Sequence, residues 1–218
     1  MLQYIYRAIV MLVAIPFHEA AHALVSWKLG DSTAKDMGRL SLNPLAHFDP
    51  MGALCMIVAG VGWAKPVPTR AYRFRDPKKG MALTALAGPV ANLLLAFVSA
   101  VLYKSVMYVS LAHGGAGAIV TAVTTILYYM IVMNVSLAVF NLLPVPPFDG
   151  SRIMLTFLPQ RIYFRIMQYE RYIFMGMFLL LMLGVLDRPL GALNYYTMQI
   201  LDNATRFVDN IALSLLFG

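Results

Sequence analysis

The chain has 218 residues, of which 60% are apolar and only 12% are charged, and its mean hydropathy is +0.71. A soluble domain usually carries roughly 25% charged residues, so this composition excludes a disordered chain and argues against a soluble globule. The apolar residues fall in long runs, which predicts an all-α integral membrane protein. The net charge is +7, but the Lys and Arg residues do not form a polar domain in which basic runs alternate with aromatic residues. We therefore expect no nucleic-acid partner.

The long apolar runs define the expected membrane spans, each of which needs about 20 residues. Four stretches qualify in chain order: Tyr4 to Trp27, Met81 to Leu111, Ala118 to Leu143, and Ile173 to Leu186 with its flanks. A fifth stretch, Leu190 to Phe217, contains Asp202, Arg206 and Asp209 among regularly spaced apolar residues. That pattern suits an interfacial amphipathic helix as well as a span. The predicted fold is a polytopic helical bundle.

We predict a single membrane-embedded domain over residues 1–218, with a core of about 4–152 and C-terminal helices at about 165–217. Between the first two spans the chain is rich in Gly and Pro. Within it, Met51 to Gly62 is apolar but too short to cross a bilayer, which predicts a re-entrant or interfacial element followed by an extended piece. Cys55 is the lone cysteine, so internal disulfides and cysteine-only zinc sites are excluded, and we expect a small buried hydrophobe there.

The basic residues predict the orientation. Nine of the 17 Lys and Arg lie between Lys28 and Gly80, and four lie in the loop after the third span. Spans two and three can form a hairpin that brings both loops to one side, which the positive-inside rule assigns to the cytoplasm of a cell-membrane protein with its N-terminus outside. Lys104 and Arg7 lie near span ends, where long side chains can snorkel.

The start of the chain also permits a secretory-signal interpretation. Arg7 precedes an apolar run, and Ala21-His22-Ala23 is similar to a small-residue cleavage site. The rest of the chain is itself membrane-embedded, and cleavage would discard the most unusual residues of the first span. We therefore expect this span to be retained.

Those unusual residues form an H-E-x-x-H pattern, His18-Glu19-Ala20-Ala21-His22. An ionisable group at mid-bilayer costs at least about 2–3 kcal/mol on insertion scales, so the cluster requires a compensating interaction. Histidines four residues apart share a helix face and can bind one metal ion. Glu19 is offset around the helix, so it reaches the water beside the metal and is suited to act as a general base. The pattern predicts one Zn²⁺ per chain.

A catalytic zinc takes three protein ligands and leaves the fourth position to water. Asp149 is the best third candidate, because it follows the third span at the predicted depth of His18 and His22. Its Pro-Pro-Phe-Asp-Gly context is also good turn chemistry, and a capping role can coexist with metal binding. His47 and Asp49 offer an alternative metal site in a loop, where turns and caps are the commoner outcome.

These residues resemble the site-2 protease family of intramembrane zinc metalloproteases. His18 to His22 is similar to the first family motif, Ala87 to Asn92 to the central G-P-x-x-N segment, and Asn141 to Gly150 to the N-x-x-P-x-P-x-D-G motif. The three motifs occur in the family's order and cover about Tyr4 to Arg152. Where the family often has L-D-G-G, this chain has Phe148-Asp149-Gly150-Ser151, which keeps the ligand and alters the local turn.

The resemblance implies a three-helix catalytic core with zinc on His18, His22 and Asp149 and with Glu19 as general base. It also implies that Asn141 places the substrate carbonyl or its oxyanion and that Asn92 assists, although helix packing explains Asn92 equally well. A minimal member without a PDZ or CBS domain is expected.

The resemblance further implies a substrate-pairing segment. Gly62 to Thr69 is similar in position to an extended segment that pairs with substrate as an added strand. The expected contacts are Trp63, Ala64, Lys65 and Val67.

The predicted function is an intramembrane zinc endopeptidase that acts in regulated intramembrane proteolysis. Its expected partners are a transmembrane protein or peptide substrate, cleaved near the cytoplasmic side, and membrane lipid. One alternative is a metal transporter, which should spread ionisable groups across the membrane rather than gather them at one end. A second is a non-catalytic zinc-binding membrane protein, which has no use for a base such as Glu19.

Overall fold

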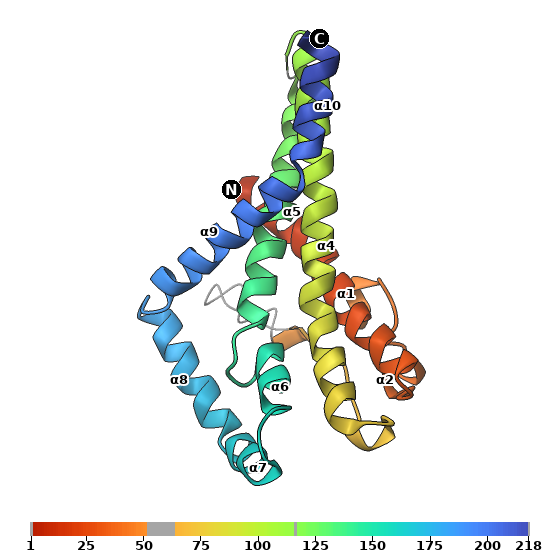
Figure 1. Ribbon diagram of the computed structural model, residues 1–218, viewed down its shortest axis with the longest axis vertical. Coiled ribbons are helices and arrows are strands. Elements are labelled where there is room, and N and C mark those ends of the chain that lie inside the picture. The colour runs from red at the N-terminus through yellow and green to blue at the C-terminus, as the bar shows by residue number, and fades with distance from the viewer. Residues whose placement is uncertain (1, 52–63, 116, 218) are drawn as a thin grey trace. The chain divides into compact units, whose positions relative to one another are not determined.

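The computed structural model describes residues 2–51, 64–115 and 117–217, and every regular element in these ranges is helical (Figure 1). The predicted all-α class is confirmed. Trp63, Cys55 and nearly all of the predicted re-entrant element lie outside the described residues. The elements are α1 (Leu2–Lys28), α2 (Thr33–Asp36), η1 (Pro44–Ala46), η2 (Ala71–Arg73), α4 (Pro77–Ala112), α5 (Ala118–Asn141), α6 (Asp149–Leu155), α7 (Gln160–Gln168), α8 (Glu170–Met182), α9 (Asp187–Ala204) and α10 (Arg206–Phe217).

Three of the described helices, α1, α4 and α5, are long and apolar enough to cross a membrane. They coincide with the first three predicted spans. Only 33–39% of the most apolar window of each helix is buried inside the protein, which leaves most of its apolar surface for lipid. The chain is therefore a multi-pass membrane protein.

The fourth predicted span, Ile173 to Leu186, is wrong as a continuous helix. Helix α8 ends at Met182, the chain turns through Gly184 with φ of +68°, and α9 begins at Asp187. The apolar stretch is therefore interrupted between α8 and α9, so it is at most a broken span. The left-handed conformation at Gly184 carries little cost for glycine and explains why the helix stops inside an apolar run.

The C-terminal stretch is two helices rather than one. The break falls at Thr205, whose side chain is fully buried and whose hydroxyl donates to the carbonyl of Leu201 at 3.0 Å. Helix α10 has 12 residues, about 18 Å at 1.5 Å per residue, which is too short to cross a bilayer by itself.

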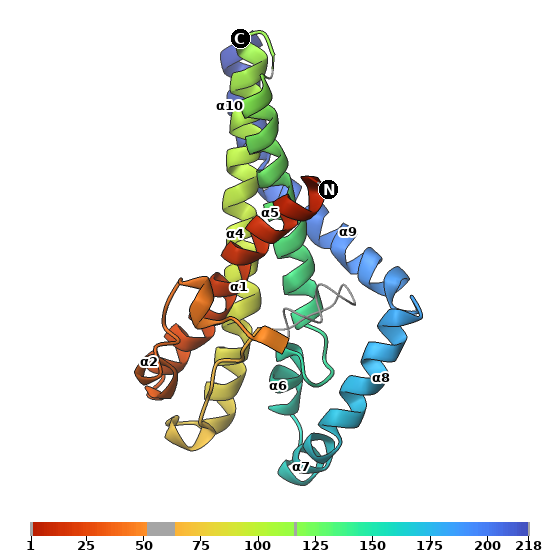
Figure 2. The ribbon, with the colours of Figure 1, turned by 180° about the vertical axis from the view of Figure 1, so that it is seen from behind.

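By its internal contacts the chain divides into two compact units, described separately here: a first unit of Met1–Ala14, Asn92–Val139 and Asp187–Gly218, and a second unit of Ile15–Ala91 and Phe140–Leu186. In the first unit α10 runs beside the later part of α4 (Figures 1 and 2). Small residues on α4 allow close helix packing. The buried core comprises Ala96, Ala100, Ile131, Val135, Val139 and Leu201.

The first unit also contains a charged cluster. Lys104 of α4 does not snorkel to an interface as predicted, because its side chain is only 16% exposed. Its Nζ lies 2.8 Å from Oδ1 of Asp202 and 2.7 Å from Oδ2 of Asp209, and the Tyr108 hydroxyl donates to Asp209 at 3.1 Å. Two carboxylates thus compensate one buried ammonium and hold α9 and α10 against α4.

We predict that Lys104→Met destabilises the protein, because it leaves two neighbouring carboxylates without their counter-ion. The expected loss is roughly 1–3 kcal/mol, since the exposure of Asp202 screens part of the interaction. Thermal unfolding in detergent measures it as a lower Tm. Lys104→Arg is the matched control and should retain most of the stability. An unchanged Tm in Lys104→Met would show that the cluster does not hold the C-terminal helices.

Candidate active site

The second unit brings together the three predicted ligands from two elements. His18 and His22 lie on one face of α1, with 8% and 7% of their surface exposed, and Asp149 is the first residue of α6. The Nε2 atoms of His18 and His22 are 3.0 Å apart. Oδ2 of Asp149 lies 3.2 Å from His18 Nε2 and 3.3 Å from His22 Nε2. Within the described ranges this is the one His, Cys, Asp or Glu group with the geometry of a metal site.

The hydrogen bonding of His22 shows what the cluster requires. Its Nδ1 lies 2.7 Å from the carbonyl oxygen of Thr84 on α4, and because a carbonyl only accepts, Nδ1 carries the proton. In the neutral ring Nε2 then presents a lone pair to His18 and to the carboxylate of Asp149. Such a bond is the usual device that orients a metal-binding histidine. Acceptors facing one another in a buried place need a cation between them.

The distances fit zinc. Tetrahedral coordination at about 2.0–2.1 Å places ligand atoms about 3.3–3.4 Å apart. The observed separations of 3.0, 3.2 and 3.3 Å are close to that value. Three protein ligands also leave the fourth position open, which is typical of a catalytic rather than a structural zinc.

The turn before α6 determines where Asp149 lies. Phe148 packs on Phe140 with ring centroids 4.3 Å apart, and Ser151 donates its hydroxyl to the Phe148 carbonyl at 2.7 Å. A side chain at Gly150 would collide with the backbone of Leu142, so glycine allows α6 to start against this segment. The departure from L-D-G-G at Ser151 is therefore accommodated, because the added hydroxyl bonds within the turn.

Asp149 is ionised in this setting. Burial alone would raise the pKa of its carboxyl, but without a bound metal ion the rings of His18 and His22 can carry a proton on Nε2 and donate it to the carboxylate, which outweighs burial and holds that pKa well below its usual range. A permanently charged carboxylate is the form that binds a metal ion.

Helix α4 packs tightly against the histidines at Gly88. A methyl group added there would collide with Nε2 and Cε1 of His22 and with Cε1 of His18. The G-P-x-x-N segment of the sequence singles out Gly88 as a motif residue. It does not predict that the imidazoles of His18 and His22 pack directly against this glycine. Side chains larger than hydrogen are excluded because they would occupy the position of the ligands.

The other predicted catalytic residues are placed less directly. Glu19 is half-buried on α1, and its charge interacts with His22. Asn141 ends α5 in the second unit and is half-buried. Asn92 lies in the first unit and is fully buried. Both residues have an interaction partner. The catalytic roles of all three remain predictions.

The described part of the predicted substrate-pairing segment has no regular secondary structure and is anchored near both ends. Ala64, Lys65 and Val67 are described, whereas Trp63 lies outside the described residues. The Lys65 N–H donates to the carbonyl of His47 at 2.9 Å, and the Arg70 N–H donates to the carboxylate of Asp31 at 2.6 Å. The role of this segment in binding substrate stays a prediction.

His47 stabilises the loop that supports this segment. Its side chain is buried, and its Nε2 donates to the carbonyl of Ser41 at 2.8 Å, while the Arg39 guanidinium donates to the Ala46 carbonyl. In the part of the chain that the structure describes, neither His47 nor Asp49 belongs to a metal-site group. The alternative metal site of the sequence analysis is not supported.

Asp31 is a structural residue that the sequence analysis missed. It is fully buried, accepts from the hydroxyl and the N–H of Thr33 at 2.5 and 3.0 Å, and lies 3.9 Å from the Arg73 guanidinium. Burial would raise its pKa, but these hydrogen bonds, the Arg70 N–H and the Arg73 charge lower it below the usual value. The Asp-Ser-Thr sequence of an Asx turn was the available signal.

The C-terminal end of the predicted substrate-pairing segment also contacts α6. Arg152, three residues after Asp149, donates to the hydroxyl of Thr69 at 3.3 Å. The same short helix therefore carries a predicted metal ligand and holds the segment predicted to receive substrate.

Comparison with known proteins agrees with this geometry. The model of Peptidase family M50 matches residues 105–184. A protein of Bacillus subtilis (strain 168), provisionally named zinc metalloprotease YwhC, is 39% identical over 187 residues, which cover 86% of this chain and 82% of that protein. The chain belongs to peptidase family M50, the site-2 protease family. The predicted family and enzyme class, a zinc metalloprotease, are thereby confirmed.

More distant relatives share part of their length. Proteins provisionally named zinc metalloprotease Rip2, from Mycolicibacterium smegmatis, and zinc metalloprotease MJ0611, from Methanocaldococcus jannaschii, are each 29% identical. The matches cover 64% and 63% of this chain, and 52% and 63% of those proteins. No solved structure matches the chain.

We predict that Gly88→Ala lowers zinc affinity by at least about tenfold, because the methyl group displaces both imidazoles. Zinc content after dialysis against a graded chelator measures the change. Gly176→Ala on α8 is the matched control, since nothing lies within 4 Å of a Cβ at that position. Equal zinc retention in the two variants would contradict the close packing at Gly88.

We predict that Asp31→Asn destabilises the protein at neutral pH and less so in acid. A carboxyl with a lowered folded-state pKa contributes stability above its unfolded value of about 3.9, and that contribution is lost as the pH falls through the folded value. The difference in Tm between the wild type and Asp31→Asn, measured in detergent, should be largest near pH 7 and shrink below about pH 4. A difference independent of pH would contradict this role.

Proposed function

We propose that this protein is an intramembrane zinc endopeptidase that hydrolyses peptide bonds in transmembrane segments of membrane proteins, as in regulated intramembrane proteolysis. The observation that carries the proposal is the buried convergence of His18, His22 and Asp149, two of them on a helix long and apolar enough to span a membrane. A three-ligand site of catalytic type on such a helix favours a peptidase that acts at the bilayer.

The three residues would hold the ion and leave one position for water and substrate. Bound zinc supplies Lewis-acid polarisation of the scissile carbonyl and acidifies water. Glu19 lies beside His18 in the sequence and is half-buried, so it can take a proton from water and return it to the leaving amine. The charge of Glu19 acts on His22, so its carboxylate lies near the metal cluster, where this transfer would take place.

The predicted substrate-pairing segment supports a mode of substrate binding. A helical substrate must unwind locally, because its carbonyls are otherwise hydrogen-bonded and shielded. Residues 64–69 have no helix or strand of their own and are anchored near both ends, so their backbone can pair with an unwound substrate strand. The Arg152 to Thr69 contact connects that strand to the helix that begins with Asp149.

The charge distribution supports a location in the cell membrane with the active site toward the cytoplasm. The basic residues concentrate in the stretch from Lys28 to Gly80 and in the loop after α5, and the positive-inside rule assigns both to the cytoplasmic side. Lipid is then the surrounding solvent for α1, α4 and α5.

A metal transporter is less well supported. The charges clustered in the first unit, those of Lys104, Asp202 and Asp209, are paired with one another. An ion pathway needs successive sites that a cation can enter and leave, and a lysine held between two carboxylates does not provide one.

The proposal predicts that Glu19→Gln keeps its zinc and loses peptidase activity by at least about 100-fold, because the amide cannot accept a proton. Cleavage of a tagged single-span peptide in proteoliposomes is the measurement, with zinc content determined on the same preparation. A Glu19→Gln variant that binds zinc and cleaves as well as the wild type would contradict the role of Glu19 as general base.

Asp149→Ala should lower zinc below one ion per chain, because a buried ligand is lost. Asp36→Ala, which removes an exposed carboxylate from α2, is the matched control and should leave the stoichiometry unchanged. Equal zinc in both variants would remove Asp149 from the ligand set.

A further inference from the structure

A cavity lies in the second unit, where α1 ends and α4 begins. Its volume is about 430 Å³, within the range of roughly 300–1,000 Å³ typical of ligand pockets. It shares no residue with the metal cluster. The lining residues used here are Lys28, Leu29, Phe74, Arg75, Lys79 and Leu83.

The rim of the cavity is cationic. Lys28, Arg75 and Lys79 line it against a single carboxylate, Asp76. Asp76 accepts the backbone N–H of Lys79 at 3.1 Å and lies 3.7 Å from its Nζ. Lys28 and Arg75 are exposed and have no ion-pair partner among the residues that the structure describes. The rim thus carries a net charge of about +2 and attracts an anion.

The floor of the cavity is apolar. Phe74 is 5% exposed and packs against Gly80 so closely that a side chain there would collide with its ring. Leu29 and Leu83 continue this surface, and Leu83 is 49% exposed. A cationic rim above an apolar floor suits a ligand with a charged end and a hydrocarbon end better than it suits a free ion.

The position of the cavity indicates where such a ligand comes from. Lys28 is the last residue of α1 and Pro77 the first of α4, and both helices are long and apolar enough to cross a membrane. As the ends of two candidate membrane spans, the residues around the cavity are suited to lie near lipid headgroups. Basic pockets between membrane helices are suited to acidic headgroups.

We propose that this cavity binds the headgroup of an anionic phospholipid. Lys28 and Arg75 hold the phosphodiester, Lys79 adds a third positive charge, and the first carbons of the acyl chains lie on Leu29, Phe74 and Leu83. This assignment does not depend on the peptidase mechanism, because none of these residues belongs to the metal site.

Native mass spectrometry of the full chain in a neutral detergent tests the proposal. The protein is titrated separately with dioctanoyl phosphatidylglycerol, with dioctanoyl phosphatidylcholine and with inorganic phosphate. We expect one phosphatidylglycerol per chain at concentrations at which neither other probe is retained. Equal retention of the two lipids, or retention of phosphate as strong as that of the lipid, would overturn the assignment.

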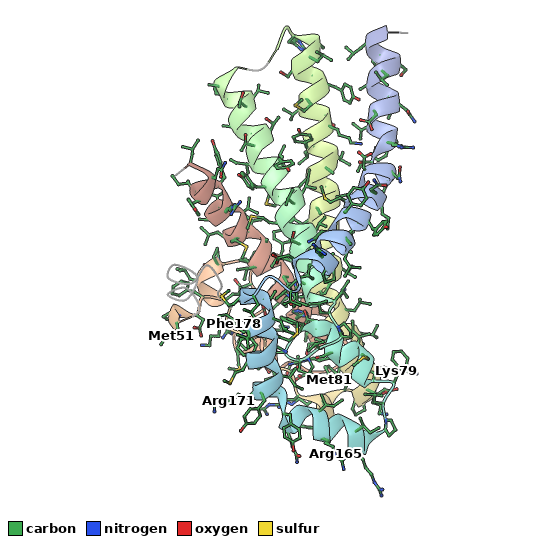
Figure 3. The ribbon with its side chains drawn as sticks, turned by 90° about the vertical axis from the view of Figure 1, so that its left-hand side faces the viewer. Met51, Lys79, Met81, Arg165, Arg171 and Phe178 are labelled. Atoms are coloured by element: carbon green, nitrogen blue, oxygen red, sulfur yellow. The ribbon has the colours of Figure 1, made fainter. Side chains whose placement is uncertain are left out.

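Matched variants separate this cavity from general attraction to a basic surface. Lys28→Gln, Arg75→Gln and Lys79→Gln together should weaken phosphatidylglycerol binding by at least about tenfold. Arg161→Gln, Arg165→Gln and Arg171→Gln remove the same charge from α7 and α8, where Arg165 and Arg171 lie apart from Lys79 (Figure 3), and should change binding less than about twofold. An equal loss in both triple variants would refute the site.

Leu83→Trp provides a test that leaves every charge in place. The indole should fill the apolar floor and lower lipid affinity, while the exposed position of Leu83 lets the protein fold. Zinc content and Tm verify that each variant is folded. Unchanged phosphatidylglycerol affinity in folded Leu83→Trp would show that the lipid binds elsewhere.

Discussion

The second unit depends on the convergence of His18 Nε2, His22 Nε2 and Asp149 Oδ2. Acceptors 3.0–3.3 Å apart in a buried place repel one another unless a cation lies between them. The surrounding structure serves this arrangement: the Thr84 carbonyl sets the ring tautomer, and Gly88 lets α4 approach the imidazoles. Packing α1 against α4 and α6 and forming the metal site are therefore one and the same event, so metal binding contributes to folding free energy.

The predictable parts of this protein are those in which a local pattern determines the geometry. Uninterrupted apolar runs predict α1, α4 and α5, because a lipid environment leaves helix as the one way to satisfy the backbone of such a segment. The i, i+4 spacing of His18 and His22 places both on one face whatever the fold. Asp149 was reachable through topology alone, because a hairpin of two spans returns the chain to the depth of the histidines.

The unpredicted parts depend on contacts between distant residues or on backbone atoms. Every residue has a backbone carbonyl, so the sequence does not show that the one of Thr84 would orient His22. Asp31 looks like an ordinary loop carboxylate in the sequence, because the backbone N–H that donates to it belongs to Arg70, 39 positions later. The helix break at Thr205 lies in a sequence whose apolar spacing continues on both sides. Lys104 was expected to snorkel, because nothing local shows that two carboxylates about 100 residues later would compensate it.

Few charges are present in this chain, and their partners differ according to their surroundings. Lys104 is compensated by two carboxylates, and the carboxylate of Asp149 requires a cation shared with His18 and His22, since a charge removed from water is stable only with a counter-charge close by. Lys28 and Arg75 have no such partner among the described residues, although they line a cavity with an apolar floor. Cations at the end of a membrane span find their counter-charge in the bilayer itself, where acidic headgroups are concentrated. Lys28 and Arg75 are exposed, so burial does not force them to pair; an acidic headgroup is the partner we propose for them because it matches the cationic rim and its acyl chains match the apolar floor.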